Sequence, residues 1–291
     1  MNLPCTRRNV STIEPAVVEP VMIQFLYLGR VAYDEALHLQ AEIAALRLNN
    51  RVGNVLLLLE HPPVLTLGRN ANRANVLATD ELLAQRGIRL HPINRGGDVT
   101  YHGPGQLIGY PIFDLRSLTN AQGGRLGPVD FVRRMEEALI RLCGVYGLRA
   151  GRIPGLTGVW CGPGPAGGSV LDESTGSETA PRKIAAIGIH VARGITTHGF
   201  AFNLATDLRD FQLIHPCGIT DKPVTSLAAE LSSPALAREG NGPAALPTLE
   251  ECAHQAARQF GLVFGQQVLA VGSLAELRAQ AGAFPAQNFP A

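Results

Sequence analysis

The sequence predicts a single domain of mixed α/β class, for three reasons. Apolar residues change period along the chain, because a dense apolar run from Met22 to Leu28 is followed by apolar positions at helical spacing from Ala36 to Leu46. The composition suits a well-buried core, since 46% of the 291 residues are hydrophobic and only 17% are charged. The chain also shows no internal repeat that would indicate a solenoid or a tandem array.

The expected domain is bounded by segments of low hydrophobicity. Residues 1–21 contain three prolines and little periodicity, which predicts a flexible leader. The folded domain is expected to span residues 22–284, with 285–291 as a C-terminal tail. Residues 162–181 are rich in glycine, serine and threonine and predict a disordered insertion that interrupts a sheet and loops into solvent. Residues 232–247 predict a second surface loop.

Short local signals predict the elements of the N-terminal half. The run from Val55 to Leu59 is too brief for a core helix and indicates a buried strand. Thr79 precedes two acidic residues and starts a short helix that we expect to end at Gly87. Pro128 opens a longer amphipathic helix. Between these helices, residues 95–115 predict a loop, a strand, a turn and a second strand.

The C-terminal half is expected to contain a hairpin and two closing helices. Residues 183–191 alternate as a strand does, which places Lys183, Ala185, Ile187 and Ile189 on one side. Residues 195–204 follow an Arg-Gly turn as the partner strand. The segments 248–260 and 273–281 have the pattern of helices.

Charge, hydropathy and cysteine usage exclude several classes of function. A net charge of +1 without a long basic run argues against a dedicated nucleic-acid binder. No apolar run approaches the roughly 20 residues that span a bilayer, and the N-terminus lacks an apolar signal core, so we expect a cytoplasmic protein with no membrane partner. The five cysteines are odd in number and widely spaced, which predicts free thiols. Neither the cysteines nor the histidines have metal-ligand spacing, and we expect no metal.

The basic residues are almost all arginine. Of the 25 Lys and Arg residues, only Lys183 and Lys222 are lysines. A genome biased against lysine codons explains this scarcity but not the placement. A buried lysine can lose its proton whereas an arginine cannot, so the lysines offer chemistry that the arginines do not. Lys183 heads a predicted strand and is a candidate functional residue, whereas we expect Lys222 to be solvated.

The densest cluster of special residues is Arg-Gly-Gly-Asp-Val-Thr-Tyr-His-Gly-Pro-Gly-Gln, from Arg95 to Gln106. Its glycines let the backbone approach a ligand, and Arg95, Tyr101 and His102 offer directed hydrogen bonds. This composition favours a ligand-binding wall, and the alternative is a tight hairpin with incidental polar residues. The glycine spacing, with Pro104 inside it and no helix after it, fits neither a dinucleotide loop nor a Walker motif.

Cys217 is the cysteine with nucleophile-like surroundings. It stands in the turn sequence His-Pro-Cys-Gly-Ile-Thr, residues 215–220, where a thiol can be exposed and can receive N–H donors that favour the thiolate. A thiol needs a base or a cation to activate it. His215 and Lys183 are the two candidates, and the sequence places neither beside the thiol. The other four cysteines are expected to be structural or, for Cys5, to lie in the leader.

Five motifs occur in an order that resembles a known enzyme family. Residues 95–110 read Arg-Gly-Gly-Asp-Val-Thr-Tyr-His-Gly-Pro-Gly-Gln-Leu-Ile-Gly-Tyr. The others are Glu-His-Pro-Pro-Val-Leu-Thr-Leu-Gly-Arg (60–69), Arg-Lys-Ile-Ala-Ala-Ile-Gly-Ile (182–189), His-Gly-Phe-Ala-Phe-Asn-Leu (198–204) and Pro-Cys-Gly-Ile (216–219). Together they resemble the octanoyl-[acyl carrier protein]:protein octanoyltransferases of lipoate biosynthesis.

This resemblance implies a fold like that of the biotin and lipoate ligases, a single α+β domain with a mixed sheet flanked by helices. It also implies a catalytic dyad in which Cys217 is the nucleophile and Lys183 lowers its pKa and relays protons. The thiolate would attack the thioester of an octanoyl-phosphopantetheine arm, and an acceptor lysine would resolve the acyl-enzyme to an amide. The resemblance implies no cofactor.

The resemblance further implies the partners and the binding residues. The donor would be octanoyl-acyl carrier protein, and the acceptors would be lipoyl domains of 2-oxoacid dehydrogenase E2 subunits and the glycine cleavage H protein. We expect a monomer. Arg69, Arg73, Arg149 and Arg152 are candidates to meet an acidic carrier protein, although scattered arginines commonly form a solvated surface. The substrate-binding set comprises His61, Arg95, Gly96, Gly97, Asp98, Val99, Thr100, Tyr101, His102, Ala186, Ile187, Gly188, Gly199, Phe200 and Ala201.

Two other functions stay open at this point. An ATP-dependent lipoate or biotin ligase belongs to the same fold neighbourhood, and in it the glycine loop would hold an adenylate while Cys217 would be incidental. A non-catalytic module that binds lipoyl domains or acyl carriers would not need Cys217 at all. Use of ATP distinguishes the first, and the effect of Cys217→Ser distinguishes the second.

Overall fold

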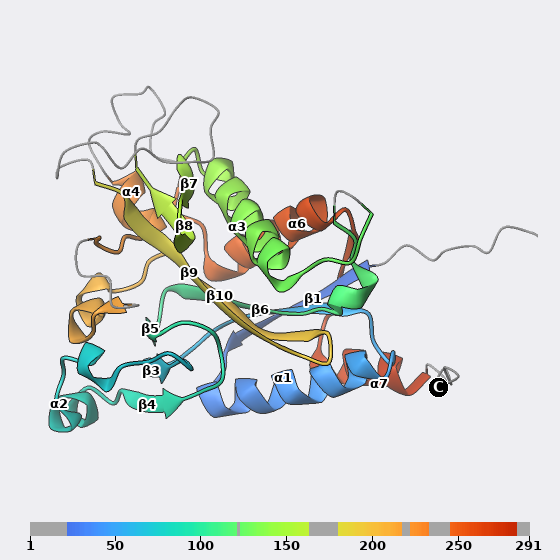
Figure 1. The fold of residues 1–291 in the computed structure, drawn as a ribbon, viewed down its shortest axis with the longest axis horizontal. Helices are drawn as coiled ribbons and strands as arrows, with labels where there is room; N and C mark the ends of the chain where they lie inside the picture. The colour runs from blue at the N-terminus through green and yellow to red at the C-terminus, as the bar shows by residue number, and fades with distance from the viewer. Residues whose placement is uncertain (1–21, 121–122, 163–179, 217–221, 233–244, 284–291) are drawn as a thin grey trace, which may run out of the picture.

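The computed structural model describes residues 22–120, 123–162, 180–216, 222–232 and 245–283 (Figure 1). These residues form a large mixed sheet with helices on both faces and a smaller sheet beside it. The predicted leader 1–21, the tail 285–291 and most of the two predicted loops at 162–181 and 232–247 lie outside the described residues. Within the described ranges, no helix is long and apolar enough to cross a membrane.

The larger sheet has eight strands in the order β11-β1-β2-β6-β10-β9-β8-β7. β1 pairs in parallel with both of its neighbours, and the remaining pairs are antiparallel, which confirms the mixed sheet. The strands are β1 (Met22–Arg30), β2 (Asn54–Glu60), β6 (Gln106–Ile112), β7 (Ala150–Ile153), β8 (Leu156–Cys161), β9 (Arg182–Ala192), β10 (Ile195–Asn203) and β11 (Gln267–Ala270).

Two pairs of helices cover the two faces of this sheet. α3 (Pro128–Val145) and α6 (Leu249–Phe264) lie on one face, and α1 (Tyr33–Leu48) and α7 (Leu274–Ala283) lie on the other (Figure 1). Strand β2 supplies both cores, because successive side chains of a strand point to opposite faces. Leu56 and Leu58 pack into the core under α3 and α6, whereas Leu57 and Leu59 pack into the core under α1.

The smaller sheet has the order β4-β3-β5 and was not predicted as a separate unit. Its strands have four residues each, too few for the alternation of β3 and β4 to be recognised in the sequence. Together with α2 and the 3-10 helix η4 they enclose a small core that contains Leu65, Val99, Tyr101 and Phe211. The short elements are β3 (Val64–Leu67), β4 (Arg89–Pro92), β5 (Val99–His102), α2 (Asp80–Gln85), α4 (Leu227–Leu231) and the 3-10 helices η1 (Arg73–Asn75), η2 (Leu115–Ser117) and η4 (Leu208–Leu213).

The predicted hairpin is confirmed as β9 and β10. Its two turn residues, Arg193 and Gly194, have φ values of 51° and 83°. Two successive positive φ values are what a two-residue hairpin turn needs to match the twist of its strands. The predicted insertion is flanked by β8 and β9, which pair with each other in the sheet.

The predicted alternation along β9 is wrong at its first residues. Val159 pairs with Ala185, but the next residue of β8, Trp160, pairs with Lys183, so Ile184 is the extra residue of a β-bulge. Ile184 and Ala185 both enter the core under α3. Lys183 lies instead over the ring of Trp160, which packs outside that core. The bulge therefore directs Lys183 away from Ala185.

Candidate active site

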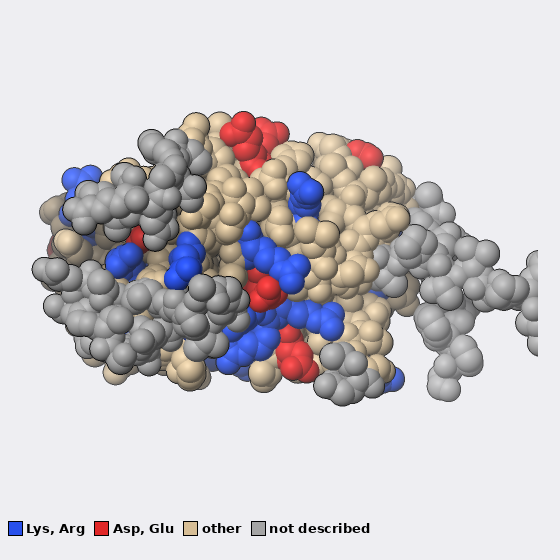
Figure 2. All heavy atoms as spheres, turned by 90° about the horizontal axis from the view of Figure 1, so that it is seen from above, with Lys and Arg blue, Asp and Glu red and all other residues tan. Residues whose placement is uncertain are grey.

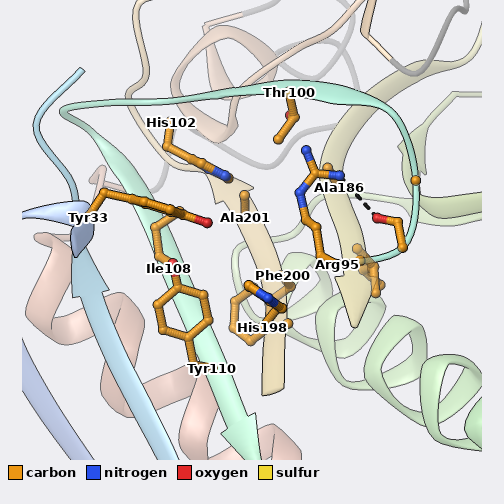
Figure 3. Close-up of a pocket in the computed structure, with 15 residues that line it drawn as sticks. Tyr33, Arg95, Thr100, His102, Ile108, Tyr110, Ala186, His198, Phe200 and Ala201 are labelled. Carbon is orange, nitrogen blue, oxygen red and sulfur yellow. Dashed lines mark hydrogen bonds between the residues drawn. The ribbon is translucent and has the colours of Figure 1, made fainter. Parts of the chain in front are cut away.

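A narrow pocket lies between the first turn of α1 and the strands β5, β6, β9 and β10 (Figure 3). It encloses about 50 Å³. Ala186 and Ala201 are cross-strand neighbours on β9 and β10, as are Gly188 and Gly199, so small residues leave the space. The lining residues are Tyr33, Arg95, Gly96, Gly97, Thr100, His102, Ile108, Tyr110, Ala186, Ile187, Gly188, His198, Gly199, Phe200 and Ala201.

Glycine at position 188 allows the 95–97 loop to lie against β9. A Cβ on Gly188 would lie 2.7 Å from the carbonyl oxygen of Gly96, a backbone atom that could not give way cheaply. The two segments are joined by the Gly96 N–H, which donates to the carbonyl of Ile189 at 3.0 Å. Gly188 thus permits a close approach of the 95–97 backbone to β9, whereas we expected the motif glycines to let the backbone approach a ligand.

Most of the predicted binding residues line this pocket, but β5 divides its own residues between two sides. Thr100 and His102 line the pocket. Val99 and Tyr101 alternate with them and point into the small core, where the Tyr101 hydroxyl donates to Asp210 at 2.7 Å. The expectation that all of residues 95–102 line one pocket is therefore wrong for Val99 and Tyr101.

Two further predicted residues stand behind the pocket. Asp98 fastens the loop, because its carboxylate accepts the backbone N–H groups of Asn72 at 3.0 Å and Val99 at 2.7 Å. His61 is fully buried between the carbonyl of Val31 and the hydroxyl of Tyr110, each 2.7 Å from a ring nitrogen. Neither Asp98 nor His61 lines the pocket. Both hold the residues that do.

Arg95 brings a positive charge into the pocket wall. Its Nη2 donates to the carbonyl of Thr66 at 2.8 Å and to the Thr66 hydroxyl at 2.9 Å, and its Nη1 donates to the carbonyl of Gly96 at 3.0 Å. These bonds fix the guanidinium between β3 and the 95–97 loop. The side chain is buried, so its charge acts strongly on its neighbours.

Three buried histidines near Arg95 are held neutral. Burial lowers the pKa of His102 to about 3, with smaller contributions from His61 and Arg95. Burial likewise lowers the pKa of His198 to about 4, helped by Arg95. Burial also lowers the pKa of His61 to about 4. At neutral pH these rings are hydrogen-bonding groups without charge, so none of them supplies a cation to the site.

A chain of hydrogen bonds links the pocket to the backbone beside Lys183. The Nδ1 of His102 lies 2.8 Å from the side-chain oxygen of Gln106, whose amide donates to Asn203 at 2.9 Å. The Asn203 amide donates to the carbonyl of Thr225 at 2.9 Å. The Thr225 N–H in turn donates to the carbonyl of Lys183 at 2.8 Å. The pocket and the start of β9 are thus one connected polar framework.

Lys183, at the start of β9, is largely buried, with 7% of the residue exposed. Its Nζ lies 4.6 Å from the centre of the Trp160 ring. It lines a small cavity together with Thr100, Ala186 and Ala201, three residues of the main pocket. The β-bulge at Ile184 makes this possible, since it puts Lys183 and Ala186 at the same opening.

Cys217 lies outside the described residues, but the chain on either side of it is placed. Pro216, the preceding residue, lines the same small cavity as Lys183. Before it, the His215 N–H donates to the carbonyl of Asn75 at 2.7 Å. After the gap, the Lys183 N–H donates to the carbonyl of Pro223 at 2.9 Å. The ends of the segment that carries Cys217 are therefore anchored at Lys183 and its cavity.

The thiols that the structure describes are suited to packing rather than to nucleophilic attack. Cys143, Cys161 and Cys252 are free and buried. Burial raises the pKa of Cys143 and of Cys161 well above the usual range, and it raises the pKa of Cys252 to about 12. The described residues also contain no group of three or more His, Cys, Asp or Glu side chains that could hold a metal ion.

A wider groove of about 620 Å³ adjoins the pocket on the α3 side of β9. It shares Ala186, Ile187 and Gly188 with the pocket and reaches Lys183 at its inner end. Its other walls are the first two turns of α3, including Val129 and Arg133, and the exposed side chain of Arg69. The groove thus forms an open approach from solvent to Lys183.

The sequence missed several residues that shape the site. Tyr33 lines the pocket without a sequence signal, because it belongs to an ordinary amphipathic run, and Ile108 belongs to the quoted motif 95–110 but was not selected. Tyr110 and His198 belong to quoted motifs but were not selected. Trp160 was also missed, although it is the only tryptophan in the chain and a signal could have come from that singularity.

Comparison with known proteins gives the same fold in distant structures. A crystal structure of lipoate-protein ligase A bound with ATP superposes with a TM-score of 0.58 at 15% identity, covering 89% of this chain and 92% of that one. The bi-partite lipoate protein ligase of Thermoplasma acidophilum, solved with its E2 lipoyl domain, gives 0.57 at 16% identity, covering 90% and 91%. At this identity the likeness concerns the fold, which confirms the predicted ligase-like architecture.

Sequence relatives are much closer and define the family. Residues 32–239 match the family described as the lipoyl protein ligase A/B catalytic domain. An octanoyltransferase of Acidobacterium capsulatum is 54% identical over 88% of this chain and 96% of its own length, and one of Koribacter versatilis is 48% identical over 88% and 90%. The chain therefore belongs to the octanoyltransferase family of lipoyl protein ligase A/B catalytic domains, and it is an acyltransferase of lipoate biosynthesis.

Proposed function

We propose that this enzyme moves an octanoyl group from octanoyl-acyl carrier protein to a lysine of a lipoyl domain through a thioester on Cys217. The observation that supports the proposal most is the small cavity where Lys183 and Pro216, the residue before Cys217, meet the pocket residues Ala186 and Ala201. A nucleophile carried by that segment would stand between the lysine and the acyl pocket. The acceptors are E2 lipoyl domains and the glycine cleavage H protein.

The first half-reaction exchanges one thioester for another. The Cys217 thiolate forms a bond to the acyl carbonyl carbon, and the bond from that carbon to the pantetheine sulfur breaks. Lys183, as an ammonium, stabilises the attacking thiolate and gives its proton to the leaving thiolate. The products are the acyl-enzyme and the free carrier thiol, so no ATP is consumed.

The second half-reaction forms the amide. The amine of the acceptor lysine attacks the acyl carbonyl, and the bond to the Cys217 sulfur breaks. Lys183, now neutral, takes the proton that the amine releases and returns to its ammonium form beside the regenerated thiolate. An amide is more stable than a thioester, which drives the transfer. The Gly96 N–H does not serve the oxyanion, since it donates to Ile189.

The acyl chain is proposed to lie in the narrow pocket. Its small residues Gly188, Gly199 and Ala201 favour a straight chain without branches. Tyr33 and Tyr110, from α1 and β6, line the pocket as well (Figure 3). The polar groups of this pocket include uncharged histidines and the anchored Arg95, which bind without attacking the substrate.

The groove beside α3 is proposed to admit the phosphopantetheine arm. Lys183 lines it, its walls are partly apolar, and Arg69 stands on its side with charge complementary to a phosphate, whereas Arg133 is paired with Glu136 at 2.7 Å. Of the other arginines suggested for carrier docking, Arg152 is bonded to Glu136 and Glu137, and Arg73 pairs with Asp80. Figure 2 shows that basic side chains on the face seen from above lie among acidic ones. Arg69, which lines the groove, is thus a better docking candidate than Arg73 or Arg152.

The experiment that tests this function compares acyl donors. The purified enzyme is incubated with an apo lipoyl domain and either octanoyl-acyl carrier protein without ATP or free octanoate with ATP and magnesium. We expect an octanoyl-lysine product only with the carrier thioester. Product from octanoate and ATP with release of pyrophosphate would instead identify a ligase. Size-exclusion chromatography of the same sample tests the predicted monomer.

A further inference from the structure

We propose that Trp160 is a positioning residue for this reaction, whose indole face holds the side chain of Lys183 as an ammonium and aims it at the small cavity lined by Pro216 and Val224. The proposal rests on the role proposed above for Lys183. Trp160 lies outside all five motifs that carry the family resemblance. It also turns the only tryptophan of the chain into a reporter of the site.

The first observation is a built contact between two buried side chains. Trp160 and Lys183 are direct cross-strand partners on β8 and β9. The Nζ lies 4.6 Å from the ring centre, within the range of a cation–π interaction. Trp160 is completely buried and Lys183 is 7% exposed, so water screens the contact little. The β-bulge at Ile184 brings Lys183 opposite Trp160.

The second observation is that the backbone of β8 makes room for the lysine. Gly158 has a φ of 124°, a region that side chains rarely adopt. A Cβ there would lie 2.6 Å from the Ala185 carbonyl oxygen and 3.3 Å from Cε of Lys183. The Gly158 N–H donates to buried Glu136 at 3.0 Å, which fixes this part of the strand. The aliphatic stem of Lys183 therefore passes over Gly158 to reach the ring.

The third observation concerns what orients the indole. Its N–H is buried and has no hydrogen-bond partner among the residues that the structure describes. The ring packs on Ile153 and Leu156 from β7 and β8. A buried tryptophan ordinarily finds an acceptor for its N–H. Packing and the cation, rather than a hydrogen bond within this part of the chain, set the position of the ring.

Other charged groups around Lys183 are largely occupied with arginines. Glu136 on α3 accepts bonds from Arg133 at 2.7 Å and Arg152 at 3.1 Å. Glu230 on α4 accepts bonds from Arg182 at 2.7 Å and 2.9 Å. On the groove side and the 222–225 segment, the titratable or charged groups that the structure describes are Arg69, Arg133, His190 and Lys222.

The chemical consequence follows from burial. Desolvation disfavours an ammonium, whereas the negative face of an aromatic ring stabilises it. Trp160 would therefore keep Lys183 protonated to a higher pH than an aliphatic residue in the same place. A protonated Lys183 is the form that stabilises the Cys217 thiolate and supplies the first proton. Phenylalanine at position 160 would retain part of this effect, and leucine would retain none.

The contact is tested first by tryptophan fluorescence of the intact protein, without substrate. Emission is recorded from pH 7 to 11 for the wild type and for Lys183→Met, which keeps the length of the side chain but not its charge. We expect a step in the wild-type emission as the ammonium loses its proton and no such step in Lys183→Met. Tyrosine ionisation affects both proteins equally. Identical titrations for the two proteins would overturn the contact.

The positioning role is tested by the pH profile of kcat/KM for Trp160→Phe and Trp160→Leu. At pH 7.5 we expect a loss of about tenfold for leucine and about threefold or less for phenylalanine. The alkaline limb should move to lower pH in Trp160→Leu and stay close to that of the wild type in Trp160→Phe. A merely structural tryptophan would lower activity in both variants without moving the limb, and that result would refute the proposal.

The two proposals fail in different ways. If Lys183→Met retains full activity, the proposed function of Lys183 is wrong, although the fluorescence step can still show the contact. If Lys183→Met is inactive but Trp160→Leu has the wild-type pH profile, the function stands and the role of Trp160 is wrong. Iodoacetamide labelling of Cys217, measured against Cys217→Ser, gives a readout without turnover. The rate at neutral pH should fall in Trp160→Leu and not in Trp160→Phe.

Discussion

The two faces of the large sheet are built from the same strands and differ in what they bury. Along β10, Phe200 and Phe202 pack toward α3 and α6, where Phe260 and Phe264 meet them in an apolar core. Ala201 and Asn203 alternate with them and face the other side. That side also buries an apolar core under α1, but around the pocket it buries histidines, an arginine and a lysine. One strand thus separates a stabilising core from a polar pocket.

This difference teaches how the chain can hold buried charge without losing its fold. The apolar face lowers the free energy of folding, since burying a Phe or Leu side chain contributes roughly 1.5–3 kcal/mol. The polar face costs free energy unless each group is bonded, and Arg95, His61 and His102 are all bonded. Substitutions on the pocket face should therefore change activity, and those on the α3 and α6 face should change stability.

The largest effect is expected for Lys183→Met. Removing the ammonium takes away both the charge beside the thiolate and the proton donor, so kcat/KM should fall by about a thousandfold. The free energy of unfolding should change by no more than about 1 kcal/mol, because a buried charge contributes little net stability. Steady-state transfer and urea unfolding measure the two quantities. A large fall in the free energy of unfolding alongside the fall in kcat/KM would contradict the separation of activity and stability between the two faces.

Phe264→Ala should give the opposite pattern. Phe264 packs on Phe113, Phe131 and Phe260, and its removal leaves a cavity. We expect the free energy of unfolding to fall by about 3–5 kcal/mol. Below the unfolding transition, kcat/KM should stay within about twofold of the wild type. A large fall in kcat/KM of the folded protein would show that the two faces are coupled.

The neutral histidines make the pocket face sensitive to acid. Burial lowers the pKa of His61 and His198 to about 4 and that of His102 to about 3, whereas a histidine of an unfolded chain titrates near 6.5. Between these values the unfolded chain binds protons that the folded chain does not. The free energy of unfolding is therefore highest above about pH 6.5 and falls as the pH falls. At pH 5 each histidine lowers it by roughly 2 kcal/mol relative to neutral pH.

Urea unfolding at pH 7.5 and pH 5.0 measures this dependence. In His61→Gln the difference between the two pH values should shrink by roughly 2 kcal/mol. His254→Gln is the matched control, since His254 is exposed on α6. The explanation fails if His61→Gln and His254→Gln have the same pH dependence.

The smallest effect is expected at the edge of the apolar face. Thr248 caps α6, because its hydroxyl accepts the Glu251 N–H at 3.2 Å and the Glu251 carboxylate accepts the Thr248 N–H at 2.8 Å. Thr248→Ala should lower the free energy of unfolding by about 1 kcal/mol and leave transfer unchanged. Thr248→Ser should restore most of the loss. Thermal unfolding of the three proteins provides the comparison.

The sequence predicted most of the large sheet and its helices because their signals are local. The apolar run at β2, the capping threonine of α2 and the turn of the β9–β10 hairpin each depend on adjacent residues. The four-residue strands β3 and β4 were missed because pairing between segments distant in the chain stabilises them, β3 pairing with β4 on one side and with β5 on the other.

The site residues were predicted from sequence motifs. The predictions were wrong where the strands β5 and β9 send neighbouring residues to sides that the motifs did not reveal. The residues from Arg95 to His102 were selected together, yet β5 turns Tyr101 into a core. Lys183 was expected beside Ala185, yet a bulge of one residue turns it to the other side. A bulge leaves no mark in the apolar pattern of β9, and Trp160, which needs that bulge to meet Lys183, was therefore missed.

The central claim is that the polar face serves a covalent octanoyl intermediate on Cys217. The most direct test is the intact mass of the enzyme after incubation with octanoyl-acyl carrier protein in the absence of an acceptor. We predict an increase by one octanoyl group that maps to Cys217, disappears with hydroxylamine and is absent from Cys217→Ser. An unmodified wild-type enzyme that still transfers octanoate to a lipoyl domain would contradict it.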